Sequence, residues 1–175
     1  MIHSCILLLE AAARRHPDKL AMVDETSRTT FAELREQALR FSRHIPEDWR
    51  NQPIAVCMPK SADCVVAFFG ILYSGNFYVP LDPKSPPARL EKMIRDLGPK
   101  AVVTSSRSRA VIDEACAGQA LPVWDLRAAL EAGAREAPAD SLRRVERVID
   151  TDPIYCIYTS GSTGAPRAWW SRIEA

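Results

Sequence analysis

Residues 154–167 run Ile-Tyr-Cys-Ile-Tyr-Thr-Ser-Gly-Ser-Thr-Gly-Ala-Pro-Arg and join an apolar segment to a loop rich in hydroxyl groups and glycine. Four of the first five residues are β-branched or aromatic, and the run follows Pro153, which predicts a short strand. Gly161 and Gly164 permit positive φ, so successive backbone N–H groups of the loop can converge on an anion. The sequence therefore predicts a strand that delivers an anion-binding loop.

The side chains of this loop suit a triphosphate. Its hydroxyl groups are hydrogen-bond donors, and Arg167 adds a forked cation for phosphate oxygens. The alternative is a solvated turn, which is what most Ser/Thr/Gly clusters between strands form. A Walker P-loop is excluded because the chain contains no Gly-Lys pair. The predicted polyphosphate-binding residues are Thr159, Ser160, Gly161, Ser162, Thr163, Gly164 and Arg167.

The stretch Tyr158–Arg167 resembles the phosphate-loop signature of the adenylate-forming (AMP-binding) enzymes, which include acyl-CoA synthetases, luciferases and the adenylation domains of nonribosomal peptide synthetases. The family pattern is Tyr-Thr-Ser-Gly-Ser-Thr-Gly, any residue, then Pro-Lys-Gly. This chain has Arg167 in the lysine position and Ala168 in the glycine position. Arg167 keeps the positive charge of the pattern, and Ala168 does not keep the glycine.

Two upstream segments resemble the same family in the same order. Residues 29–34, Thr-Thr-Phe-Ala-Glu-Leu, are similar to its Thr-Tyr-x-Glu-Leu element. Residues 72–82, Leu-Tyr-Ser-Gly-Asn-Phe-Tyr-Val-Pro-Leu-Asp, resemble its Leu-x-x-Gly-x-x-Tyr-x-Pro-Leu-Asp element and favour the amino-acid-activating branch. An acyl-CoA synthetase-type ligase stays open as the alternative. The resemblance covers residues 4–167, which are interpreted as the N-terminal part of an adenylation domain.

The resemblance implies a chemistry and its partners. In the family, a carboxylate attacks the α-phosphate of ATP, usually with Mg²⁺, and an acyl-adenylate forms as pyrophosphate leaves. A thiol then accepts the acyl group. The implied cofactors are ATP and Mg²⁺, and the implied partners are an amino acid or other small carboxylate and a carrier-protein thiol. No catalytic acid–base residue is predicted in this chain.

In this family the substrate pocket, the adenine- and ribose-binding residues and the catalytic lysine all follow the phosphate loop. We therefore expect the isolated chain to have no adenylation activity, and ATP–pyrophosphate exchange with amino acids and aryl acids tests this. Two alternatives remain at this point. One is a nucleotide- or partner-binding module that a separate chain complements, and the other is an unstable, non-functional fragment.

Residues 168–175, Ala-Trp-Trp-Ser-Arg-Ile-Glu-Ala, do not resemble the family. One permitted coding of residues 167–175, CGG GCG TGG TGG TCG CGC ATC GAG GCC, gives Gly-Val-Val-Val-Ala-His-Arg-Gly from its third base. That peptide is the continuation that the family pattern leads us to expect. The hypothesis is a frameshift near Arg167, which makes residues 168–175 a non-homologous tail, and sequencing the gene tests it.

Composition and charge argue against several classes of partner and site. The chain has 23 basic and 22 acidic residues, so it offers no charge pattern for a nucleic-acid partner. The five cysteines form no C-x-x-C pair, and buried reduced thiols are expected instead of disulfides or a metal site. No apolar stretch approaches the roughly 20 residues of a membrane span, so we expect a cytoplasmic chain with no membrane partner.

Alternating helical and strand patterns predict an α/β fold: a layered, mostly parallel sheet with flanking helices, which is an incomplete N-terminal portion of the adenylate-forming fold. The alanine-rich segment 127–136 is interpreted as helical, and Arg143, Arg144 and Arg147 as a solvated surface segment. The predicted helices are about 4–15, 30–45, 61–72, 86–98 and 108–117, and the predicted strands are 20–23, 53–58, 77–79, 101–104, 122–125 and 154–158.

Overall fold

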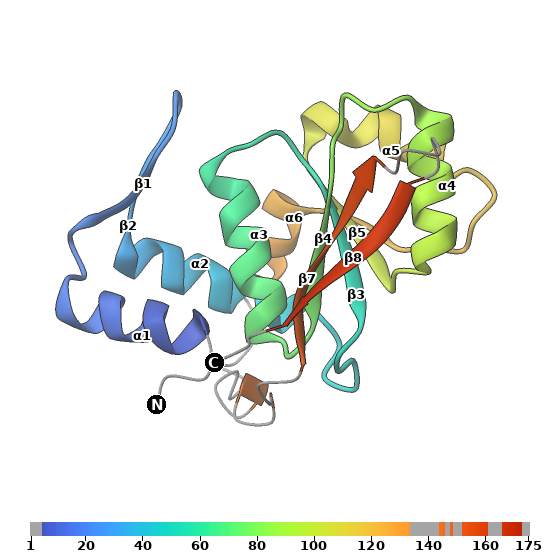
Figure 1. Cartoon of the computed structure of the whole chain (residues 1–175). Helices are drawn as coiled ribbons and strands as arrows, with labels where there is room; N and C mark the ends of the chain where they lie inside the picture. The colour runs from blue at the N-terminus through green and yellow to red at the C-terminus, as the bar shows by residue number, and fades with distance from the viewer. Residues whose placement is uncertain (1–4, 134–143, 146–147, 149–151, 161–165, 173–175) are drawn as a thin grey trace.

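The computed structural model describes residues 5–133, 144–145, 148, 152–160 and 166–172 of the 175-residue chain. Among these residues, six strands form a mixed sheet in the order β6-β5-β3-β4-β7-β8 (Figure 1). The first five run parallel, and β8 is antiparallel to β7. The strands are β3 (Pro53–Cys57), β4 (Phe77–Leu81), β5 (Ala101–Thr104), β6 (Val123–Asp125), β7 (Pro153–Ser160) and β8 (Pro166–Arg172).

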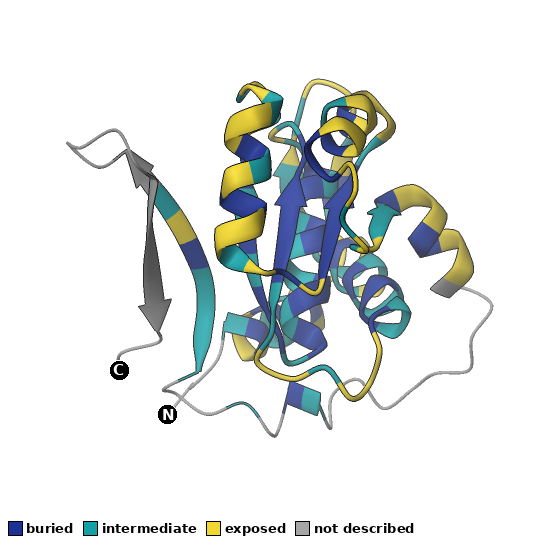
Figure 2. Cartoon of the chain, turned by 90° about the vertical axis from the view of Figure 1, so that its right-hand side faces the viewer, coloured by how far each residue is buried: buried dark blue, intermediate teal, exposed yellow. Residues whose placement is uncertain are grey.

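Helices cover both faces of this sheet, because the central strands are apolar on both sides. The central strands are coloured as buried in Figure 2. Along β3, Ile54 and Val56 join one buried cluster, whereas Ala55 and Cys57 join the other. The first cluster packs against α2 (Phe31–His44), α3 (Ala62–Tyr73) and α6 (Leu126–Gly133). The second packs against α4 (Pro87–Leu97) and α5 (Arg109–Ala115), which follows the short 3₁₀ helix η1 (Ser106–Ser108).

A small antiparallel sheet of β1 (Leu20–Val23) and β2 (Arg28–Thr30) stands apart from the main sheet, between α1 (Cys5–Arg15) and α2. α1 is tied to its neighbours through Glu10, whose Oε1 accepts from Arg35 Nε at 2.8 Å and from the Tyr73 hydroxyl at 2.6 Å. Tyr73 is fully buried, so this shared, partly buried carboxylate joins α1, α2 and α3 at the edge of the core.

The predicted α/β class and the order of its elements are confirmed, and several boundaries follow from local chemistry. Thr30 closes a capping box with Glu33 at the start of α2, and the Ser61 side chain accepts from Cys64 N at the start of α3. Gly98, with φ of 58°, ends α4 in the left-handed conformation. β2 and β8 were not predicted, and β8 includes residues 168–172 of the predicted tail. The frameshift hypothesis concerns the gene and stays a prediction.

The interpretation of Arg144 as part of a solvated surface segment is wrong. Its guanidinium donates to carbonyl oxygens at the C-terminal ends of α2 and α3, which are far away in sequence. The acceptors are Ser42 O (3.3 Å), Ile45 O (3.0 Å), Pro46 O (2.9 Å) and Ser74 O (3.1 Å). We call this arrangement the Arg144 clamp. Arg143 and Arg147 lie outside the described residues.

The five cysteines are free thiols, as the sequence predicts, and four of them are buried. Burial raises the pKa of Cys57 to about 12 and that of Cys64 to about 11, because a thiolate would lose its hydration there. We therefore expect a native chain at pH 8 to expose at most one fast-reacting thiol, the partly exposed Cys5, to a disulfide reagent. All five should react in guanidinium chloride, and rapid labelling of several native thiols would contradict this packing.

No helix in the described part of the chain combines the length and the apolar character needed to cross a membrane.

Candidate functional site

The two ends of the predicted phosphate loop lie on β7 and β8, which form a hairpin. In the register of this hairpin, Thr159 pairs with Arg167 and Ser160 pairs with Pro166. The structure therefore brings the backbones of Thr159, Ser160 and Arg167 together at the two ends of the loop. The other predicted residues of the site, Gly161, Ser162, Thr163 and Gly164, lie outside the described residues.

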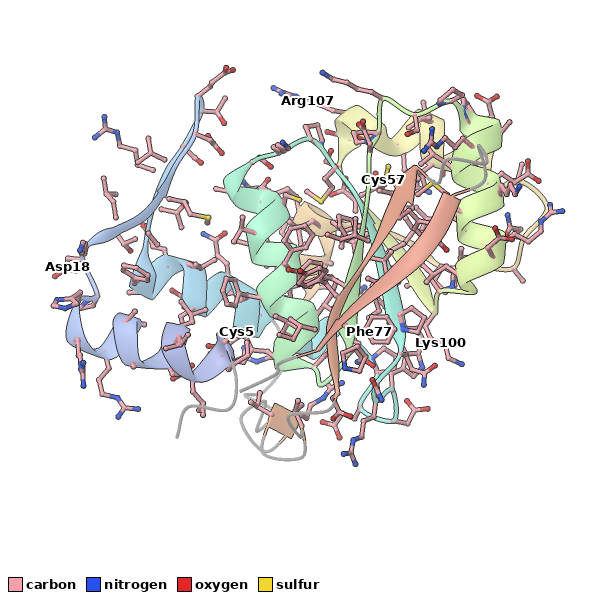
Figure 3. The ribbon with its side chains drawn as sticks, viewed as in Figure 1. Cys5, Asp18, Cys57, Phe77, Lys100 and Arg107 are labelled. Carbon is pink, nitrogen blue, oxygen red and sulfur yellow. The ribbon has the colours of Figure 1, made fainter. Side chains whose placement is uncertain are left out.

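The parallel direction of β7 places this end of the hairpin at one particular edge of the sheet. β7 runs parallel to β4, and β4 runs parallel to β3, so their carboxyl ends point the same way. In Figure 3, Cys57 marks the carboxyl end of β3, while Phe77 and Lys100 mark the amino edge. Open parallel sheets bind their ligands outside the carboxyl ends of the strands, and the loop leaves β7 there.

The connections at this edge also diverge. After β3 the chain enters α3 on one face, and after β4 it enters α4 on the opposite face. Such a divergence between neighbouring strands creates the crevice in which doubly wound folds bind nucleotides. The sequence predicted the alternation of helices and strands. It did not predict that the connection from β4 passes β3 and reaches β5 on the other side of it, which the structure shows.

A second candidate anion site at the same edge, the N-terminus of α3, already has partners within the chain. Asp24 Oδ2 accepts from Ala62 N at 2.8 Å, and Ser61 Oγ accepts from Cys64 N at 3.3 Å. The backbone N–H donors of Ala62, Thr26 and Ser27 hold the pKa of Asp24 well below its usual range, so the carboxylate is charged at neutral pH. Asp24 thus supplies the negative charge that stabilises the N-terminal end of α3.

The turn after β4 is polar and ordered by its own side chain. Asp82 Oδ1 accepts from Lys84 N at 2.9 Å, and the Asp82 carbonyl accepts from Ser85 N at 2.9 Å. Asp82 and Lys84 are both exposed. They follow the strand next to β7, at the edge that carries the phosphate loop.

β7 presents alternate side chains to the two faces of the sheet. Cys156 is fully buried against the α4 side, and Tyr158 packs against the same cluster. The Tyr158 hydroxyl donates to the Met93 carbonyl of α4 at 3.1 Å, and burial raises the pKa of this phenol to about 12. On the other face Tyr155 stacks on Tyr78, with ring centroids 5.8 Å apart. Sequence alternation could have predicted the two faces, but the partner of Tyr158 could not be predicted from local spacing.

Two further observations concern other kinds of site. A shallow hollow is lined by the apolar Leu72, Val145, Val148 and Ile154 and by the polar Asn76, among other residues. It lies by the starts of β4 and β7, at the amino edge and away from the loop. Within the described ranges, no group of three or more His, Cys, Asp or Glu side chains is placed to hold a metal ion.

Comparison with known proteins matches a model of the AMP-binding enzyme family to residues 9–168. Phosphinothricin tripeptide synthetase PhsC of Streptomyces viridochromogenes is 35% identical over 167 residues, covering 91% of this chain and 14% of that protein. A dimodular nonribosomal peptide synthase of Bacillus subtilis is 31% identical over 162 residues, covering 91% of this chain and 7% of that protein. The chain thus spans a small part of these relatives.

The fold is also similar to solved structures. The crystal structure of VinN superposes with a TM-score of 0.79 at 29% identity, over 95% of this chain and 45% of VinN. The similarity extends over nearly all of the present chain and less than half of that protein.

Proposed function

The chain belongs to the AMP-binding enzyme family, and on this basis we propose that it is the phosphate-binding part of a ligase that activates an amino acid with ATP. The observation that carries the proposal is the position of the loop. The β7–β8 hairpin places the backbones of Thr159 and Arg167 opposite each other at the carboxyl edge of a parallel sheet. This edge is where open α/β folds bind nucleotides.

In the proposed reaction, a carboxylate oxygen of the substrate attacks the α-phosphorus of ATP. A new C–O–P linkage forms, the bond from the α-phosphorus to the bridging oxygen breaks, and pyrophosphate leaves with that electron pair. The loop would hold the leaving pyrophosphate through backbone N–H groups and the hydroxyls of Ser162 and Thr163, and Arg167 would offset its growing charge. A carrier-protein thiol would then take the acyl group and release AMP.

The donor set of the loop fits this anion. Hydroxyl groups, glycine N–H groups and one guanidinium supply hydrogen bonds and positive charge, which a polyphosphate requires. Magnesium, when bound with ATP, would be held mainly by phosphate oxygens and would neutralise part of their charge. Thr159 and Ser160 complete the proposed set at the carboxyl end of β7.

Two observations support an amino acid as the substrate. The relatives named above that are 35% and 31% identical are peptide-making synthetases or synthases by name. The segment 72–82 also carries the Tyr-Val-Pro-Leu-Asp sequence that favours the amino-acid branch, and β4 with its following turn carries these residues beside β7. A carrier-protein thiol is the corresponding acceptor.

Replacing Arg167 with alanine should weaken binding of MgATP and of tripolyphosphate to the chain roughly tenfold, or about 1.4 kcal/mol, because a charge-assisted contact to phosphate is lost. Arg167→Lys should retain most of the affinity, because the family pattern has lysine at this position. Titration calorimetry measures both ligands, and AMP, which lacks the β- and γ-phosphates, should bind much more weakly.

The matched control is Arg14→Ala, which removes the same charge from the exposed face of α1, away from the hairpin. It should leave all three affinities unchanged. A wild-type chain that binds neither ATP nor tripolyphosphate would rule out the proposed phosphate-binding role. Equal loss of affinity in Arg14→Ala and Arg167→Ala would show a non-specific charge effect and would remove Arg167 from the site.

A further inference from the structure

The strand that carries the phosphate loop is attached to the sheet unevenly. β3 pairs with β4 through five residue pairs and with β5 through four. β4 and β7, in contrast, share one pair in register, Tyr78 with Tyr155. The loop begins beyond Thr159, at the other end of β7. On the β4 side, backbone pairing therefore holds the early part of β7. The loop-bearing end of β7 pairs with β8, so side-chain contacts tie this end of the hairpin to the rest of the fold.

Tyr158 supplies such a contact on the α4 face of the sheet. Its hydroxyl donates to the carbonyl oxygen of Met93 at 3.1 Å, and Met93 is buried in the middle of α4. Cys156, two residues earlier and on the same face, is fully buried in the cluster that includes α4. The phenol is protonated at neutral pH, and burial raises its pKa further, to about 12, so the hydroxyl remains a donor.

The position of Tyr158 in the chain gives this contact its significance. It directly precedes Thr159, the first proposed phosphate-binding residue, and residues 159–160 are followed by the loop itself. A shift of the Tyr158 ring along α4 would move both ends of the loop, because Thr159 is paired with Arg167 across the hairpin. Binding groups must be held to within about 0.5 Å of their working positions by such supporting contacts.

We propose that Tyr158 is a positioning residue for the phosphate loop: its hydrogen bond to the Met93 carbonyl fixes the loop-bearing end of β7 on α4. Tyr158 does not contact phosphate in this role. The inference rests on the proposed function, and it assigns to Tyr158 a role that differs from that of the donors in the loop.

The test compares two variants that each remove one hydroxyl from β7. Tyr158→Phe loses the hydrogen bond to the Met93 carbonyl. Tyr155→Phe also loses a hydroxyl, but it leaves that hydrogen bond in place and keeps the ring that stacks on Tyr78. We expect Tyr158→Phe to bind MgATP and tripolyphosphate about fivefold more weakly, as for one neutral hydrogen bond. Tyr155→Phe should bind like the wild type. Both ligands are titrated without denaturant, under conditions in which circular dichroism shows that each variant is folded.

Amide hydrogen exchange without ligand provides a readout that a general loss of stability would not reproduce. In Tyr158→Phe, the amides of Thr159 and Ser160 should exchange several-fold faster, while those of β3 should keep their wild-type rates. Unchanged exchange at Thr159 and Ser160, or a matching change in Tyr155→Phe, would overturn the inference.

The two proposals fail in different ways. A wild-type chain that binds neither ligand would overturn the proposed function and this inference with it. Wild-type binding that Tyr158→Phe retains in full would overturn the inference alone.

Discussion

An Arg144→Ala variant is expected to lose about 3 kcal/mol of unfolding free energy, a large part of the 5–15 kcal/mol typical of a domain. The Arg144 clamp donates to four backbone carbonyl oxygens, three at the end of α2 and one at the end of α3. Without the guanidinium each of these carbonyls loses one hydrogen bond, although Ser42 O, Pro46 O and Ser74 O still accept from Ile45 N, Trp49 N and Asn76 Nδ2. The negative ends of two helices also lose a cation. Urea unfolding measures the effect, and the midpoint should fall by about 1 to 2 M.

Two further variants separate geometry from charge. Arg144→Lys keeps the cation but can reach fewer carbonyls, because an ammonium has no planar fork, so it should recover only part of the loss. Arg107→Ala removes an exposed arginine from η1 and should change stability by less than about 0.5 kcal/mol. If Arg144→Ala unfolds at the wild-type urea concentration, the clamp does not hold the helix ends together.

Prediction from sequence succeeded where the determining chemistry is local. Ser61 and Thr30 begin helices through hydrogen bonds to residues three positions later, and Gly98 ends one through its own φ. Each signal lies within a few residues of its consequence. For the same reason the strand β7 followed from the apolar run after Pro153.

Prediction failed where the partners are distant in sequence. Arg144 bonds to carbonyls about a hundred residues earlier, and Asp24 caps a helix that begins at Ala62. Neither side chain differs from a surface residue in its local pattern. The acceptor of the Tyr158 hydroxyl lies 65 residues away, on α4. The phosphate-binding residues of the loop could be proposed from composition. The contact between Tyr158 and Met93 depends on how α4 packs against β7, which local sequence does not show.

A Gly70→Ala variant is expected to lose about 2 to 3 kcal/mol of unfolding free energy, because α2 and α3 touch at this glycine. A Cβ at position 70 would lie 2.6 Å from Phe41 Cδ1 and 3.0 Å from the carbonyl oxygen of Ala38. Phe41 and Ala38 are fully buried, so neither can move without separating the two helices. Alanine's higher helix propensity returns at most about 1 kcal/mol, which is less than the cost of the clash. Thermal and urea unfolding measure the net change.

The double variant Phe41→Leu/Gly70→Ala tests whether the clash with Phe41 is the cause. Leucine has no rigid ring, and its two Cδ methyl groups can turn away from the new Cβ, so Gly70→Ala should cost about 1 kcal/mol less in the Phe41→Leu background than in the wild type. The remaining cost then measures the approach of the new Cβ to the Ala38 carbonyl oxygen and to the Cβ of residue 41, each 3.0 Å away, which the leucine leaves in place. If the two costs are equal, the ring of Phe41 does not oppose the new methyl group. If Gly70→Ala is as stable as the wild type, α2 and α3 do not pack as closely as their contact at Gly70 requires.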